Sequence, residues 1–269
     1  MIVGLPAPVT VSAPAAPQTD STRQLVYGAE HALRVGRFDQ AKLMIARAMA
    51  AGATGPELDR TLADFAYASG NYAEALARYE VILKTSPDNE ALLEPAGIAA
   101  LRTGSIDRAM VLLTKATEGR TPSWRAWNAL GVAADFKSDW PLADRCFARA
   151  MELAPKEAGP INNQGWSLLS RGKWHDAVPV LERAVAMDPR SARAVHNLEL
   201  ARAAITAGLP ERQPGEAASS WSARLNDAGM AAELMGDRER AVAAFSQSLE
   251  ASDIWYARAA NNLAAMGGQ

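Results

Sequence analysis

The sequence predicts an all-α fold built from repeated pairs of short helices. First, alanine returns every 34 residues along much of the chain, a period typical of repeats made of two helices. Second, apolar and small residues around these alanines follow the 3.6-residue spacing of a helix. Third, 49% of the 269 residues are hydrophobic but only 6% are aromatic, and the abundant alanine is the best helix former. The alanines that set the period are Ala41, Ala75, Ala109, Ala143 and Ala177.

Each repeat unit contains the signals that start, turn and stop two helices. In the fourth unit, "SWRAWNALGVAADF" (123–136) has the apolar spacing of a first helix, and Ser138 takes the place of the turn glycine found in the other units. The second helix follows at once and turns Phe147 toward the first. Small residues such as Gly131 let the two helix backbones approach each other. Pro155 stops the second helix, because proline cannot continue it.

The best-preserved unit, "WNALGVAADFKSDWPLADRCFARAMELAP" (127–155), resembles the tetratricopeptide repeat family at its Trp, Leu-Gly, Ala, Phe, Ala and Pro positions. The resemblance covers about residues 22–191 and one later unit. It implies antiparallel helix pairs stacked into a right-handed superhelical solenoid, with the first helix of each pair lining a concave groove.

The repeat register breaks after Pro189 and resumes near the end of the chain. One interpretation of the break is a decayed repeat, and the other is a hinge between two binding segments. The predicted segments are a flexible Ala/Pro-rich tether at 1–21, five consecutive repeat units at 22–191, an orphan helix of a degenerate repeat at 192–207, a linker at 208–221, a sixth unit at 222–253 and a C-terminal capping helix at 254–269.

The sequence offers little that would support catalysis. The single cysteine, Cys146, lies beside an apolar residue of a second helix, where a buried inert thiol is expected. The three histidines fall far apart along the repeats, and the glycines follow the repeat period rather than forming a phosphate-binding loop. The net charge of −2 gives no basic excess for nucleic acid, and no apolar run approaches the length of a membrane span. We therefore expect a protein that is not an enzyme and uses no cofactor or metal.

The family resemblance places the candidate binding residues on the first helices. Asparagine amides there can pair with a peptide backbone, arginines can bind carboxylates, and a tryptophan offers an apolar plane. The alternative is that the polar residues are merely solvated and the tryptophan packs on a neighbouring helix. The predicted groove residues are Arg60, Asp64, Tyr67, Arg125, Asn128, Asn162, Trp166, Arg193 and His196.

A known clamp for C-terminal carboxylates, found in chaperone-binding members of the family, is matched poorly. Its best frame here reads Asn128, Val132, Asn163, Arg193 and Asn197, without the first lysine, the second polar residue and the last arginine. We therefore expect an internal or differently ended segment as the ligand.

The leading interpretation is a scaffold that binds a segment of a partner protein in its groove. The Ala- and Arg-rich chain and its closing units, "LNDAGMAAELMGDRERAVAAF" and "YARAANNLA", resemble the TadD-like proteins of tight-adherence (Flp) pilus assembly. That resemblance implies a role in assembling a bacterial pilus or secretion machine, with a periplasmic or outer-membrane-associated location and a signal or lipid anchor upstream of residue 1. A cytoplasmic location is the alternative.

Two other functions stay open at this point. One is a recruiting or regulatory subunit of an envelope polysaccharide or glycosyltransferase system. The other is a self-associating structural solenoid, although a monomer is favoured; the terminal helix with Ile254, Trp255 and Leu263 bears on it, because burial of those side chains would close the end of the stack.

Overall fold

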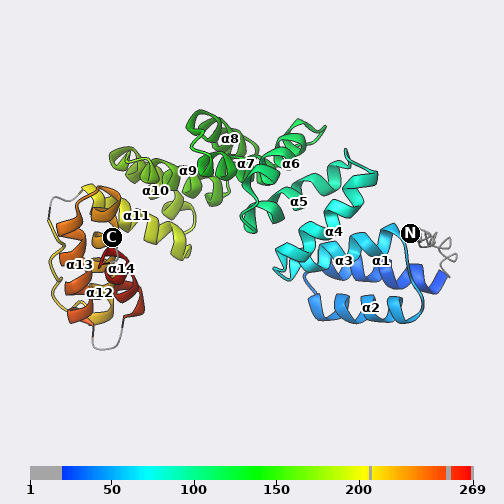
Figure 1. The fold of residues 1–269 in the computed structure, drawn as a ribbon, viewed down its shortest axis with the longest axis horizontal. Coiled ribbons are helices and arrows are strands. Elements are labelled where there is room, and N and C mark those ends of the chain that lie inside the picture. Colours follow the sequence, from blue (N-terminus) through cyan, green and yellow to red (C-terminus); the bar gives the residue numbers. More distant parts are fainter. Residues whose placement is uncertain (1–19, 206–207, 253–255, 268–269) are drawn as a thin grey trace, which may run out of the picture. The chain divides into compact units, whose positions relative to one another are not determined.

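The computed structural model describes residues 20–205, 208–252 and 256–267, and these form fourteen helices and no strand (Figure 1). The predicted all-α fold of paired helices is thus confirmed. The chain divides into two compact units, and the boundary in the sequence falls between Gly119 and Arg120. The first unit holds α1 (Asp20–Arg34), α2 (Phe38–Ala50), α3 (Pro56–Ala68), α4 (Tyr72–Thr85), α5 (Glu90–Arg102) and α6 (Ile106–Glu118). The second holds α7 (Trp124–Phe136), α8 (Trp140–Leu153), α9 (Ala158–Ser170), α10 (Trp174–Met187), α11 (Ala192–Ile205), α12 (Ala218–Leu234), α13 (Arg238–Ala251) and α14 (Ala257–Gly267).

The division into two units was not predicted, since the sequence suggested one run of five repeats over 22–191. The alanine period passes through the boundary unchanged, from Ala109 to Ala143. The period reflects how the two helices of one pair pack, so it does not report how successive pairs are joined. The predicted tether at 1–21 lies mostly outside the described residues, and its last two residues already belong to α1.

Close approach of the paired helices depends on a small residue facing a large one, as predicted. A Cβ atom added at Gly131 of α7 would lie 2.7 Å from the ring of Phe147 on α8. Phe147 is completely buried. The same arrangement recurs where Gly165 faces Leu181 and, in the repeat after the break, where Gly229 faces Phe245. The repeated residues therefore serve packing.

The turn between α7 and α8 confirms the expected left-handed backbone at the end of each first helix. Ser138 has φ 57°, and within the described residues it is the only residue other than glycine with positive φ. Gly104 and Gly172 take the equivalent place in the neighbouring repeats, each with φ 76°. A side chain with a Cβ atom resists this conformation, so the serine carries a strain that glycine avoids.

At the break in the repeats, α12 packs directly against α11 without an intervening second helix. Ala231 of α12 joins a buried cluster with Leu181, Leu198 and Leu200. Figure 1 shows α12 and α13 side by side, and α14 contacts both. The orphan helix predicted at 192–207 is thus a regular member of the stack through Ile205, the last described residue before Gly208.

The loop at the break is held by arginine side chains. Arg240 of α13 donates to the carbonyl oxygens of Ala203 and Gly208, and Arg224 of α12 binds the carboxylate of Glu216. These bonds tie the described part of the loop to α12 and α13. The helix α12 begins at Ala218, inside the linker predicted at 208–221, because serines are tolerated in the first turn of a helix as well as in loops.

The final helix α14 falls within the predicted cap at 254–269. Leu263 is partly buried and packs with Phe245 and Met266. Ile254 and Trp255 lie outside the described residues. In the part of the chain that the structure describes, no helix is both long and apolar enough to cross a membrane.

Candidate functional site

In the first unit, three of the predicted groove residues lie together. Arg60, Asp64 and Tyr67 project from α3 into a cavity of about 480 Å³ that α1, α4 and α5 complete. The other residues that line it are Glu30, Leu33, Arg34, Ala68, Tyr79 and Pro95. The cavity therefore combines aromatic and aliphatic walls with charges of both signs.

The carboxylate of Asp64 is held in place by two neighbours. The phenol of Tyr79 donates to Asp64 Oδ1 at 2.7 Å, and Arg60 Nε lies 3.6 Å from Asp64 Oδ2. Burial raises the pKa of Tyr79 far above its usual value, and the charge of Asp64 adds to this effect. The phenol thus remains a donor at every physiological pH, and Asp64 presents its carboxylate in one orientation.

Tyr67 is part of an aromatic group at the junction of α3 and α4. Its ring packs edge-on against Tyr72 at 5.5 Å between centroids and against Tyr79 at 6.5 Å. The guanidinium of Arg102 lies 5.8 Å from the ring centre of Tyr72. The sequence did not predict Tyr72 and Tyr79 as site residues, because both occupy second-helix positions that the repeat uses for packing.

In the second unit, asparagines of three first helices form a continuous hydrogen-bond chain. Asn197 of α11 donates to Asn162 Oδ1 at 3.0 Å, and Asn162 donates to Asn163 Oδ1 at 3.3 Å on α9. Asn163 in turn donates to Asn128 Oδ1 on α7 at 2.9 Å. The chain links helices that are successive in the stack and ends at the amide of Asn128.

Asn162 was expected to offer its amide to a partner, but the structure buries it. Its exposed fraction is only 6%, and both ends of its amide bond other asparagines, since a buried amide must be satisfied internally. Asn163 and Asn197 were named only in the poorly matching clamp frame. The bonded pairs Asn128–Asn163 and Asn162–Asn197 are each 35 residues apart, one more than the repeat, so asparagines at nearly the same place in successive repeats were the signal.

Three further predicted residues of this unit are open to solvent. Trp166 on α9 is 40% exposed, although it is one turn from the buried Asn162. Arg125 on α7 and Arg193 on α11 are exposed, and the guanidinium of Arg125 lies 4.7 Å from the ring centre of Trp124. Trp166 is thus partly open to solvent, while the rest of its surface is covered by protein.

His196, the last predicted residue, bridges α11 and α12. Its Nδ1 lies 3.4 Å from Asp227 Oδ2. The hydrogen bond to Asp227 raises the pKa of His196, while partial burial and the nearby Arg258 oppose the rise. The pair joins the two helices that meet at the break in the repeats.

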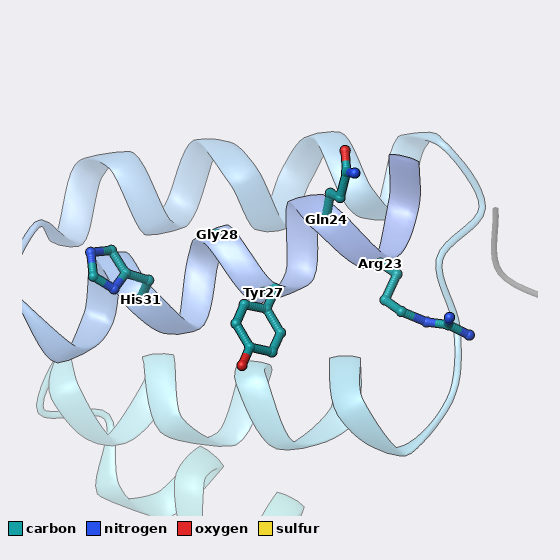
Figure 2. A pocket seen from close by; sticks show the side chains of 5 residues that line it. All are labelled: Arg23, Gln24, Tyr27, Gly28 and His31. Atoms are coloured by element: carbon teal, nitrogen blue, oxygen red, sulfur yellow. The ribbon is translucent and has the colours of Figure 1, made fainter. Parts of the chain in front are cut away.

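A larger hollow of about 730 Å³ is lined, among the described residues, by residues of α1. Figure 2 shows Arg23, Tyr27 and His31 on successive turns of this helix. Tyr27 is 72% exposed, yet its equivalent one repeat later, Thr61, is buried between repeats. Residues of four helices line the smaller cavity, so we place the candidate site there.

The described ranges offer no group of three or more histidine, cysteine, aspartate or glutamate side chains that could hold a metal ion. Cys146 is completely buried, and burial raises the pKa of its thiol to about 11. A thiol in this state is a poor nucleophile at neutral pH.

Comparison with known families agrees with this architecture. Tetratricopeptide repeat models match residues 66–132 and residues 28–90 and 162–224. Together these ranges cover more than half of the chain, which therefore belongs to the tetratricopeptide repeat family. Proteins built from this repeat mediate protein–protein interactions.

Solved structures support the fold. A tetratricopeptide repeat protein from Parabacteroides merdae matches 93% of this chain and 100% of its own, with a TM-score of 0.59 and 16% identity. PilW, described as a type IV pilus biogenesis factor, matches 91% of this chain and 99% of its own, with a TM-score of 0.56 and 14% identity. The structure "MamA MSR-1 C2" matches 64% of this chain and 98% of its own, with a TM-score of 0.53 and 23% identity.

Among curated proteins, the BBSome complex member bbs-4 of Caenorhabditis elegans is 26% identical over 129 residues. The match covers 48% of this chain and 28% of the length of that protein. These likenesses describe a shared repeat and do not transfer a partner.

Proposed function

We propose that this protein is a non-enzymatic scaffold that binds segments of partner proteins on the inner faces of its two units. The observation that carries the proposal is the cavity of the first unit, where Arg60, Asp64 and Tyr67 line one hollow. A rigid repeat stack positions such side chains at little entropic cost on binding, which is how a scaffold gains affinity without moving parts.

In the second unit, the candidate surface consists of Arg125, Asn128, Trp166, Arg193 and His196, with Asn162 beneath it as a support. Exposed tryptophan and arginine are the residue types enriched in interaction hot spots. We call these five residues, Arg125, Asn128, Trp166, Arg193 and His196, the inner face of the second unit.

The finer role that we propose is assembly of a bacterial envelope pilus or secretion machine, in the periplasm or at the outer membrane. The TadD-like features of the closing units support it, and the likeness to the type IV pilus factor PilW agrees with it at the level of the fold. This role predicts that partners come from an envelope machine.

The test is photocrosslinking in the living source organism, with p-benzoylphenylalanine placed at Tyr67 or at Trp166. Val81 on α4, which is 61% exposed, is the matched control on a second helix. We expect the two inner positions to capture a discrete protein that the control does not, and mass spectrometry to identify it as an envelope component. Equal capture from Val81 would refute the inner-face assignment, and a cytoplasmic partner would refute the envelope role.

A further inference from the structure

The accessible charges on the inner face of the second unit are all basic. Arg125 and Arg193 are exposed, and neither has a carboxylate partner in the described part of the chain. Contact with the Trp124 ring covers one face of the Arg125 guanidinium and leaves its N–H edge for a ligand. His196 lies one turn from Arg193 on the same side of α11 and carries positive charge when protonated.

Two carboxylates on α7 and α12 are engaged by protein groups beside this surface. Asp135 of α7 is half-buried and accepts a hydrogen bond from Ser167 at 2.7 Å. The side chain of Asp227 is only 14% exposed and pairs with His196. Both carboxylates are largely covered, whereas Arg125 and Arg193 are exposed, so the surface favours an anion.

The asparagine chain adds a hydrogen-bond donor, which likewise favours an anionic ligand. Because every link runs from an amide N–H to an amide oxygen, the chain uses the oxygen of Asn128 and leaves its NH₂ group for a ligand. Within the described residues, Asn128 Nδ2 donates to no protein group. Hydrogen bonds in such a series polarise one another, which strengthens the terminal donor.

The basic donors lie on the two first helices that contact the helix of Trp166. Arg125 and Asn128 lie one turn apart on α7, Trp166 lies on α9, and Arg193 lies on α11. Helix α9 contacts both α7 and α11. An extended segment crossing the three helices would meet a basic group, an apolar plane and a second basic group in turn.

We propose that this inner face binds an acidic segment of a partner protein, whose side-chain carboxylates meet Arg125 and Arg193 and whose apolar side chain lies on Trp166. The inference rests on the proposed scaffold function and adds the chemistry of its partner. It differs from recognition of a chain terminus, because Asn163 and Asn197, which a terminal clamp would need, are committed to the asparagine chain.

The test uses fluorescein-labelled ten-residue peptides with an acetylated start and an amidated end. The acidic probe is Gly-Ser-Glu-Asp-Phe-Glu-Asp-Ser-Gly-Gly, and the neutral probe replaces each Glu and Asp by Gln and Asn. Fluorescence anisotropy at low salt is expected to show the acidic probe binding about tenfold more tightly, since two or three solvent-exposed ion pairs separate the probes. A neutral probe with a free C-terminus tests terminal recognition.

Two variants assign the effect to the surface. Arg125→Gln and Arg193→Gln are each expected to weaken the acidic probe several-fold, whereas Arg183→Gln, an exposed arginine on α10, leaves it unchanged. All three positions are exposed, so unfolding midpoints are expected to stay the same and to exclude misfolding. Salt is expected to reduce the advantage of the acidic probe.

The inference is overturned if the amidated neutral probe or the probe with a free C-terminus binds as tightly as the acidic one. It is also overturned if the acidic probe does not bind, or if Arg183→Gln costs as much as the other two substitutions. The variant Trp166→Ala distinguishes failure of the acidic preference from failure of the proposed scaffold function. If a neutral probe binds in a manner sensitive to Trp166→Ala, the scaffold role stands without the acidic preference; if every binding probe is insensitive, the inner face itself is refuted.

Discussion

The substitution Gly131→Ala tests the packing rule that determines the fold. The added Cβ atom would lie 2.7, 2.8 and 3.1 Å from three atoms of the Phe147 ring, which is buried and rigid. Overpacking of this kind costs ~1–3 kcal/mol, and the crowding of a ring by three contacts places it in the upper part of that range. Alanine regains ~1 kcal/mol of helix propensity over glycine. The net expectation is a loss of ~1–2 kcal/mol in the free energy of unfolding.

The matched control is Gly159→Ala on α9, where an added Cβ atom meets nothing within 4 Å. Without a clash, only the helix propensity remains, so the control is expected to be stabilised by up to ~1 kcal/mol. Urea unfolding followed by circular dichroism at 222 nm measures both variants. If Gly131→Ala is as stable as Gly159→Ala, the close approach of the paired helices is not what requires glycine at this position.

Three further predictions follow from particular side chains. Ser138→Gly is expected to raise the unfolding free energy by up to ~1 kcal/mol, because glycine relieves the left-handed strain; a lowered denaturation midpoint would contradict this. Cys146, with its thiol pKa raised to about 11, is expected to react with a maleimide at pH 7 only after denaturation, as mass spectrometry would show; rapid native labelling would place the thiol at the surface. The raised pKa of His196 gives stability that is fully present below about pH 6.5, its ordinary value, and is lost as the pH rises through the folded value. Thermal unfolding across this range is expected to show the loss in the wild type and not in Asp227→Asn, and an equal slope in both would refute the assignment.

The fold could be predicted from the sequence because the repeat encodes its packing locally. The facing of Gly131 and Phe147 recurs one repeat later between Gly165 and Leu181, so a period of 34 residues was enough to identify it. The contacts between successive helix pairs are not marked by a repeated residue pattern of this kind. The boundary at Gly119 and the direct packing of α12 on α11 depend on how whole helices meet, and single residue patterns do not report that.

The candidate site could be predicted only in part. First-helix positions indicated Arg60, Asp64 and Tyr67, which the structure brings together at one cavity, because side-chain direction on a helix follows from register. Register does not reveal which polar groups satisfy one another. Asn162 was expected to face a partner, yet it is buried among amides, and Tyr79 entered the cavity from a second helix to orient Asp64.

Hydrogen–deuterium exchange with the captured partner tests the central claim, that the first helices form the binding surface. Peptides covering α3 and α9 are compared with and without the partner, and α4 and α8 serve as references from the second helices. We expect exchange to slow in at least one of the two first helices while the references stay unchanged. Slower exchange confined to α4 and α8 would contradict the claim and would place the partner on the opposite faces of the helix pairs.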